Sequence, residues 1–208
     1  DRSARCATSK SRPARGRTAW SSSDRAGPWR PAARTAWMPV VSRWSAAEIT
    51  RAYEVFHGHV QEFTATGRWE GFADLFTEDA TNVEHAFGTF HGRDEIRAWS
   101  VRTMTSFPGG TMTGFPLAWQ VVDPEAGRLV CEVRNLMPDP GDGSLHEESN
   151  ITIMTYAGDG MFSREEDVYN PMRFAAMTVR WARVAQAHGR LDEEGAAYLA
   201  KYGRVVRD

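Results

Sequence analysis

Apolar side chains recur at helical spacing after a polar, Arg-rich opening. The spacings are four and three residues and predict one buried face of a long helix, formed by Ile49, Tyr53, Phe56, Val60 and Phe63. Ser45 and Glu48 form a capping box at its start, and Gly67 is placed to end it. The first element is therefore a helix with an aromatic inner face.

Three further helical patterns follow, with a weaker one at the end. Apolar residues over 69–76 predict a short second helix. A third carries Ile96 and Trp99, with Asp and Glu in its first turn, where a helix favours negative charge. Asn170 and Pro171 begin a long helix that ends at 188–189, and a weaker helix is expected over 192–201.

Strand-like stretches separated by short turns occupy the middle of the chain. They are expected at 80–87, 88–91, 115–122, 128–137, 146–156 and 161–169. Connections of hairpin length favour an antiparallel sheet. Helices first and a sheet afterwards define an α+β domain.

Composition fits a globular protein but hides a charge asymmetry. The 208 residues are 41% hydrophobic and 25% charged, with a net charge of −2. Residues 1–45 hold ten Arg and Lys against two acidic residues, which leaves 15 basic and 25 acidic residues in 46–208. That part carries a net charge of −10 and would repel nucleic acid.

Residues 1–40 show no apolar period and are expected to be disordered. Three readings compete for them: a basic arm for nucleic acid or membrane, an organelle transit segment, or sequence upstream of a natural start at Met38. We favour the start at Met38, because the expected order begins just after it. The remainder divides into a domain over 45–190 and a tail with a short helix over 191–208.

Cysteine and hydropathy patterns constrain cofactors and location. Cys6 and Cys131 form no disulfide framework, and no CxxC or Cys/His cluster suggests zinc. Cys131 is expected to be a small buried residue. No stretch approaches the roughly 18 apolar residues of a membrane helix, and no secretory h-region is present. A cytoplasmic location is the default expectation.

The stretch LFTEDATNVEHAFGTFHGRDEIRAW, with EEDVYNP further on, resembles the nuclear transport factor 2-like superfamily, in particular its SnoaL-like branch. The resemblance covers roughly residues 46–175. It implies a cone-shaped, curved antiparallel sheet wrapped around the long N-terminal helix and an apolar cavity, with an extra C-terminal helix here. It also implies frequent homodimers. Members include ketosteroid isomerases, polyketide cyclases, dehydratases, epoxide hydrolases and non-catalytic binding proteins.

The resemblance makes His85 the first catalytic candidate. In the ketosteroid isomerase-like pattern a catalytic Asp ends the run ATVED, and ATNVEH places His85 there. A His facing the cavity could transfer a proton near neutral pH. Thr152 and Val60 fall where the isomerase's partner groups would be, which weakens that assignment. The alternative is that His85 has no catalytic role and only forms hydrogen bonds within a polar wall of the cavity.

Two carboxylates are candidates for a partner of His85. On the last strand Glu165, Asp167 and Tyr169 share a face, and burial near the closing helix could raise the pKa of Asp167. Glu148 shares a face with Asn150 and Thr152 on the strand before. For each acid the alternative is a solvated outer face or dimer rim.

Aromatic and amide side chains complete the expected pocket. The substrate-binding candidates are Tyr53, Phe56, Trp99, Trp119 and Asn150. The alternative for the aromatic residues is ordinary core packing.

These observations predict an enzyme that needs no metal or other cofactor, a lyase, isomerase or cyclase for a small hydrophobic or aromatic molecule. His85 would act with Asp167 or Glu148. The alternative is a non-catalytic small-molecule binding or dimerisation module. No nucleic acid or membrane partner is expected.

Overall fold

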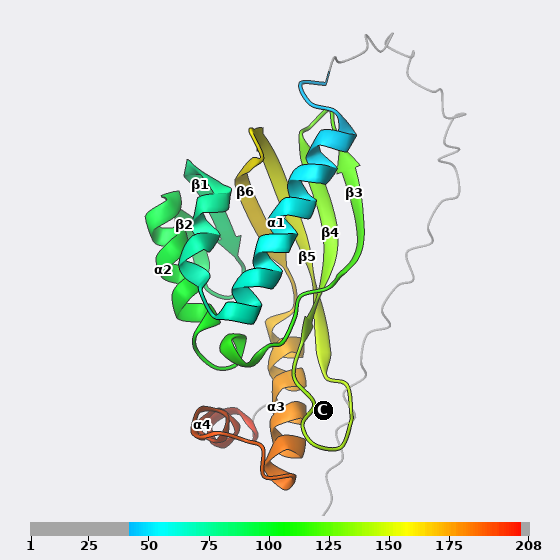
Figure 1. The fold of residues 1–208 in the computed structure, drawn as a ribbon. Coiled ribbons are helices and arrows are strands. Elements are labelled where there is room, and N and C mark those ends of the chain that lie inside the picture. Colours follow the sequence, from blue (N-terminus) through cyan, green and yellow to red (C-terminus); the bar gives the residue numbers. More distant parts are fainter. Residues whose placement is uncertain (1–41, 205–208) are drawn as a thin grey trace, which may run out of the picture. The chain divides into compact units, whose positions relative to one another are not determined.

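The structure, a computed structural model, describes residues 42–204. The expected tail over 1–40 and the proposed start at Met38 lie outside these residues. Figure 1 shows helices and strands in the order expected from the sequence. Among residues 42–204, no helix combines the length and apolar character that crossing a membrane requires.

Six strands form one sheet in the order β2-β1-β6-β5-β4-β3. Their bounds are β1 Phe76–Glu84, β2 Gly88–His91, β3 Leu117–Asp123, β4 Arg128–Leu136, β5 Glu147–Gly158 and β6 Met161–Val168. All neighbours pair antiparallel except β1 and β6, which are parallel. The predicted α+β class is confirmed, and the parallel pair is its one departure from an antiparallel sheet.

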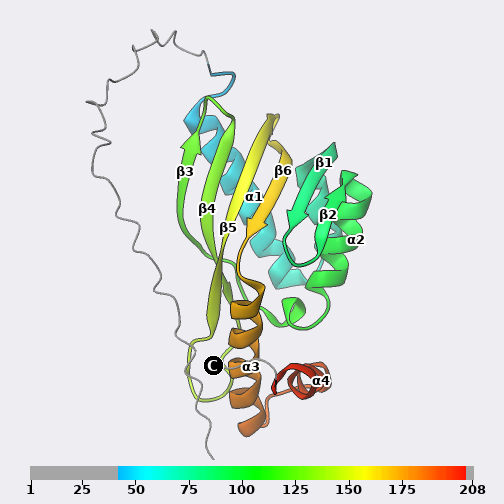
Figure 2. The same cartoon turned by 180° about the vertical axis from the view of Figure 1, so that it is seen from behind.

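Helix α1 (Ala46–Thr66) lies along the inner face of the curved sheet (Figures 1 and 2). The Ser45 hydroxyl oxygen accepts a hydrogen bond from the Glu48 backbone N–H at 3.1 Å, as the capping box predicts. Gly67 ends the helix with φ 71°, a left-handed conformation that glycine adopts without strain. The helix buries Tyr53 and Phe56 against inward residues of β4 to β6.

Helix α2 (Gly92–Met104) and the short helix η1 (Trp69–Leu75) cover the β1–β2 end of the sheet, and the short helix η2 (Gly109–Thr111) packs against α2. Ile96 and Trp99 of α2 are buried there. The Arg93 guanidinium donates two hydrogen bonds, at 2.7 and 2.5 Å, to the carbonyl oxygen of Phe76. This contact fixes the start of α2 against the start of β1.

Helices α3 (Pro171–Ala187) and α4 (Glu193–Tyr202) follow the sheet and pack on each other. Asn170 caps α3 by accepting from the Met172 N–H at 3.0 Å, and Pro171 is its first residue, as predicted. The buried face of α3 contacts Met137 and Phe107, so a second apolar core forms beyond the end of the sheet. Figure 1 shows α3 continuing past β5 and β6, with α4 beside it.

Candidate functional site

A cavity of about 960 Å³ lies between the inner face of the sheet, α1, α2 and the C-terminal helices. Most of its wall is apolar or aromatic, with Phe56, Trp69 and Trp99 among the lining residues. Its volume is near the upper end of the roughly 300–1,000 Å³ that small-molecule sites enclose. The cavity can therefore hold a ligand larger than a single ring.

The polar end of the cavity holds two carboxyl groups side by side, which we call the acid pair: Glu84 and Asp167. Glu84 is the last residue of β1, Asp167 lies on β6, and the two are partners in the parallel strand register. Burial of Glu84 and the nearby charge of Asp167 raise the pKa of Glu84 to about 8. Glu84 is therefore mostly protonated at neutral pH.

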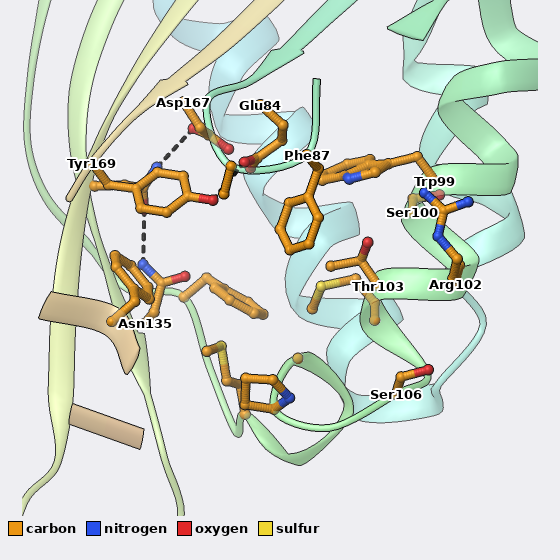
Figure 3. A pocket seen from close by; sticks show the side chains of 18 of the residues that line it. Glu84, Phe87, Trp99, Ser100, Arg102, Thr103, Ser106, Asn135, Asp167 and Tyr169 are labelled. Carbon is orange, nitrogen blue, oxygen red and sulfur yellow. Dashed lines mark hydrogen bonds between the residues drawn. The ribbon is translucent and has the colours of Figure 1, made fainter. Parts of the chain in front are cut away.

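Figure 3 shows Glu84, Asp167 and Tyr169 together at this end of the cavity. Tyr169, which follows β6, donates its hydroxyl proton to Glu84 Oε2 at 2.7 Å. Burial raises the pKa of Tyr169, so this hydroxyl keeps its proton. Glu84 is also hydrogen-bonded to Asp167, and this contact raises the pKa of Glu84 while it lowers that of Asp167. The two carboxyls thus share a proton in the manner of a coupled dyad.

Asp167 accepts two further hydrogen bonds from β5. The Thr152 hydroxyl donates to Oδ1 at 2.5 Å and the Asn150 amide at 2.7 Å. Asn150 is in turn held by Asn135 of β4, whose amide donates to Asn150 Oδ1 at 2.8 Å. These donors favour the charged form of Asp167, but its burial outweighs them, and its pKa is raised overall.

A third carboxyl, Glu165, lies two residues before Asp167 on the same face of β6 and also lines the cavity. It accepts a hydrogen bond from the Asn82 amide at 2.6 Å, and both residues are buried. Burial, followed by the charges of Asp167 and Glu84, raises its pKa well above the usual range. Burial thus favours the neutral form of Glu165.

Tyr53 lines the cavity from α1, and its hydroxyl oxygen lies 3.0 Å from the Cys131 Sγ on β4. Both residues are buried, and burial raises the pKa of Tyr53 and raises that of the Cys131 thiol to about 12. Both groups thus keep their protons. As expected, Cys131 is a small buried residue.

His85, the first candidate, lies outside the cavity. It is exposed, and its Nε2 is 3.0 Å from the Glu166 Oε1 on the outer face of β6. Side chains alternate along a strand, and Asn82 and Glu84 take the inward positions of β1. The expectation that the imidazole faces the cavity is therefore corrected, and Glu84 occupies the inward position beside it.

Two other candidates also lie outside the cavity wall. The Glu148 carboxylate forms an ion pair with Arg173 of α3, at 3.0 Å. Trp119 is 43% exposed on the outer face, where its indole N–H donates to Glu132 at 2.5 Å. A bulge between Leu117 and Trp119 turns the tryptophan outward. Neither side chain contacts the interior space, which corrects both expectations.

The remaining candidates line the cavity, namely Tyr53, Phe56, Trp99, Asn150 and Asp167. Their roles toward a ligand stay predictions. Sequence reasoning missed Glu84 as a site residue, along with Asn135 and the cavity-lining His57. For Glu84 a usable signal existed, because alternation along β1 places it on the opposite face from His85. Among residues 42–204, no three His, Cys, Asp or Glu side chains are grouped to hold a metal ion.

A curved, mostly antiparallel sheet around one long helix, with a cavity between them, defines a nuclear transport factor 2-like domain. A family model described as SnoaL-like domain matches residues 44–159. The chain belongs to this family, as its motifs indicated. No curated protein matches the chain.

Solved structures share the fold at low sequence identity. An LEH-like epoxide hydrolase from M. tuberculosis has a TM-score of 0.50 and 14% identity, over 68% of this chain and 96% of that chain. A hypothetical protein with a ketosteroid isomerase-like fold from Catenulispora acidiphila, in complex with trimethylamine, has a TM-score of 0.46 and 18% identity, over 64% of this chain and 93% of that chain. A putative polyketide cyclase from Xanthomonas campestris has a TM-score of 0.46 and 15% identity, over 62% of this chain and 94% of that chain.

Proposed function

We propose that the protein is a cofactor-free acid/base enzyme for a small hydrophobic carbonyl or hydroxy compound, of lyase, isomerase or cyclase type. The observation that carries the proposal is the proton-sharing acid pair, Glu84 and Asp167, at the polar end of an otherwise apolar cavity. A carboxyl whose pKa lies near neutrality can both give and take a proton at the reacting atoms.

The acid pair suits two roles in one site. Glu84 holds a proton at neutral pH and could donate it to a ligand oxygen. Asp167 is the partner held in place by three hydrogen bonds, and it could accept a proton from the adjacent carbon of the ligand. Tyr169 holds Glu84 in place through the hydrogen bond that its hydroxyl donates. The aromatic wall would orient the ligand and exclude water.

The test is turnover by wild-type protein and two isosteric variants. Mass spectrometry of co-purified ligand and NMR against a panel of cyclic ketones and alcohols would supply a substrate. Glu84→Gln and Asp167→Asn should each lower kcat by about 10²–10⁴-fold. His85→Ala and Glu148→Gln are matched controls, because both side chains lie outside the cavity. Unchanged kcat in both cavity variants would overturn the assignment.

A specific observation favours the alternative, a non-catalytic binding module. The polar groups at this end satisfy one another: Thr152 and Asn150 bond to Asp167, and Tyr53 bonds to Cys131. A wall of this kind can recognise a ligand oxygen without reacting with it. Tight binding of the co-purified ligand with no chemical change over a long incubation would favour this function.

The outer face of the sheet supports a further proposal, that two copies of the chain form a homodimer. Apolar residues line up across three strands there, since Val121 pairs with Val130 and Val130 with Ile153. Val121 is 59% exposed, and Trp119 lies on the same face. Val121→Lys should lower the molar mass measured by light scattering from dimer to monomer. Val55→Lys, at 61% exposure on α1, is the control.

A further inference from the structure

The two ends of the cavity are lined by ionisable groups of different kinds. The sheet end has three carboxyl groups, those of Glu84, Glu165 and Asp167. The far end has two cations that line the same space: Arg102 in the last turn of α2 and Lys201 in the last turn of α4. A ligand that fills the cavity therefore meets acids at one end and cations at the other.

The segment after α2 is joined to α4 by direct contacts, which brings the two cation-bearing helices to the same end of the cavity. Phe107, three residues after α2, donates its backbone N–H to Glu194 in the first turn of α4 at 3.0 Å. Its ring also packs on Tyr198, with centroids 5.2 Å apart, and Tyr198 lies one helical turn before Lys201. Helix α4 lies after residue 159, where the family match ends.

Neither cation is neutralised within the described part of the chain. Across residues 42–204, no carboxylate forms an ion pair with Arg102 or Lys201, and Lys201 only lies over the Tyr202 ring at 4.9 Å. The one lining carboxylate on α4, Glu194, accepts the Phe107 N–H. Figure 3 shows the Thr103 and Ser106 hydroxyls on the same side of the cavity as Arg102.

We propose that the ligand is an apolar carboxylic acid whose carboxylate binds Arg102 and Lys201 while its opposite end reaches Glu84 and Asp167. The orientation follows from the lining, because a ligand carboxylate at the sheet end would join three buried carboxyl groups with no Arg or Lys beside it, whereas the other end offers two cations. Arg is well suited to a carboxylate, which it can bind through two parallel hydrogen bonds. This inference names the substrate class of the proposed enzyme and rests on that function for the acid end only.

The experiment compares two probes of the same shape, 1-pyrenebutyrate and its neutral amide, by fluorescence titration. Wild-type protein should bind the carboxylate about tenfold more tightly than the amide at low salt. Arg102→Gln and Lys201→Gln should each reduce this preference by about three- to fivefold, and the double variant should abolish it. Binding of the amide should not change. Residues 46–208 carry a net charge of −10, so a general attraction for anions cannot produce this result.

Controls separate this inference from the proposed function. Arg51→Gln removes an exposed cation of α1 that does not line the cavity, and it should leave the preference intact. Glu84→Gln should stop turnover but keep the carboxylate preference, so the two proposals can fail independently. Equal affinity for both probes in wild-type protein, binding of neither, or a preference that survives the double variant would each overturn the inference.

Discussion

The buried carboxyl of Glu84 makes the stability of the folded protein depend on pH, and one substitution can remove this dependence. Glu84 is 7% exposed and accepts the Tyr169 hydroxyl while it shares a proton with Asp167. Glu84→Gln replaces the protonated carboxyl with a neutral group of the same shape. The amide keeps an oxygen for Tyr169 and an N–H for Asp167, and it cannot ionise.

The sign of the effect follows from the proton that each state binds. The pKa of Glu84 is about 8 in the folded protein, against an ordinary value of 4.5 in the unfolded chain. Below the unfolded value both states hold the proton. As pH rises from there to about 8, only the folded state still holds it, so the free energy of unfolding falls. At about 1.4 kcal/mol for each pKa unit, the whole window amounts to about 5 kcal/mol.

Urea unfolding at about pH 5, 6.5 and 8 measures this directly. The free energy of unfolding of Glu84→Gln, relative to wild type, should rise by about 3–4 kcal/mol from pH 5 to pH 8. Glu125→Gln, which removes an exposed carboxylate in the β3–β4 turn, should show no such trend. Parallel pH profiles for wild type and Glu84→Gln would refute the assignment of a raised pKa to this carboxyl.

Three further predictions concern the scaffold and are checked by thermal or urea unfolding. Phe162→Ala should cost about 3–5 kcal/mol, because this fully buried ring lies at the centre of the aromatic core. Ser45→Ala should cost about 0.5–2 kcal/mol through loss of the hydrogen bond from the Glu48 N–H, whereas Ser45→Asp should keep it. Gly127→Ala should destabilise the β3–β4 hairpin, since φ is 62° and the new Cβ would lie 2.7 Å from the Trp44 ring; unchanged unfolding would contradict this steric argument.

Local sequence patterns predicted the helices and strands, but they did not predict which distant strands pair. Neighbouring residues encode the caps of α1 and α3, the short β3–β4 turn and the short β5–β6 turn. The parallel pair of β1 and β6 joins segments about 80 residues apart. No turn encodes it, so hairpin logic could not predict it. Yet this pair is what brings Glu84 beside Asp167, so the centre of the candidate site depended on the least predictable contact.

The resemblance placed His85 at the position of a catalytic Asp without regard to the face of the strand on which it lies. Along β1 the apolar residues Phe76 and Ala80 are buried. Asn82 and Glu84 are buried on the same face. Alternation from these residues turns His85 outward and Glu84 inward. The motif position was therefore one residue away from the carboxyl that lines the cavity.

The alternation of side chains along a strand predicts which face of the sheet a residue lies on, but it does not predict whether that residue reaches the cavity. Glu148 and Asn150 do share a face of β5, as predicted, but only Asn150 lines the cavity. Two residues nearer the start of the strand, Glu148 has passed the end of the cavity and meets Arg173 of α3. The position of that boundary depends on where α3 packs against β5, a tertiary contact that no periodicity in β5 reports. A carboxylate on the correct face can thus serve as a helix anchor, while its neighbour two residues on holds Asp167 in the candidate site.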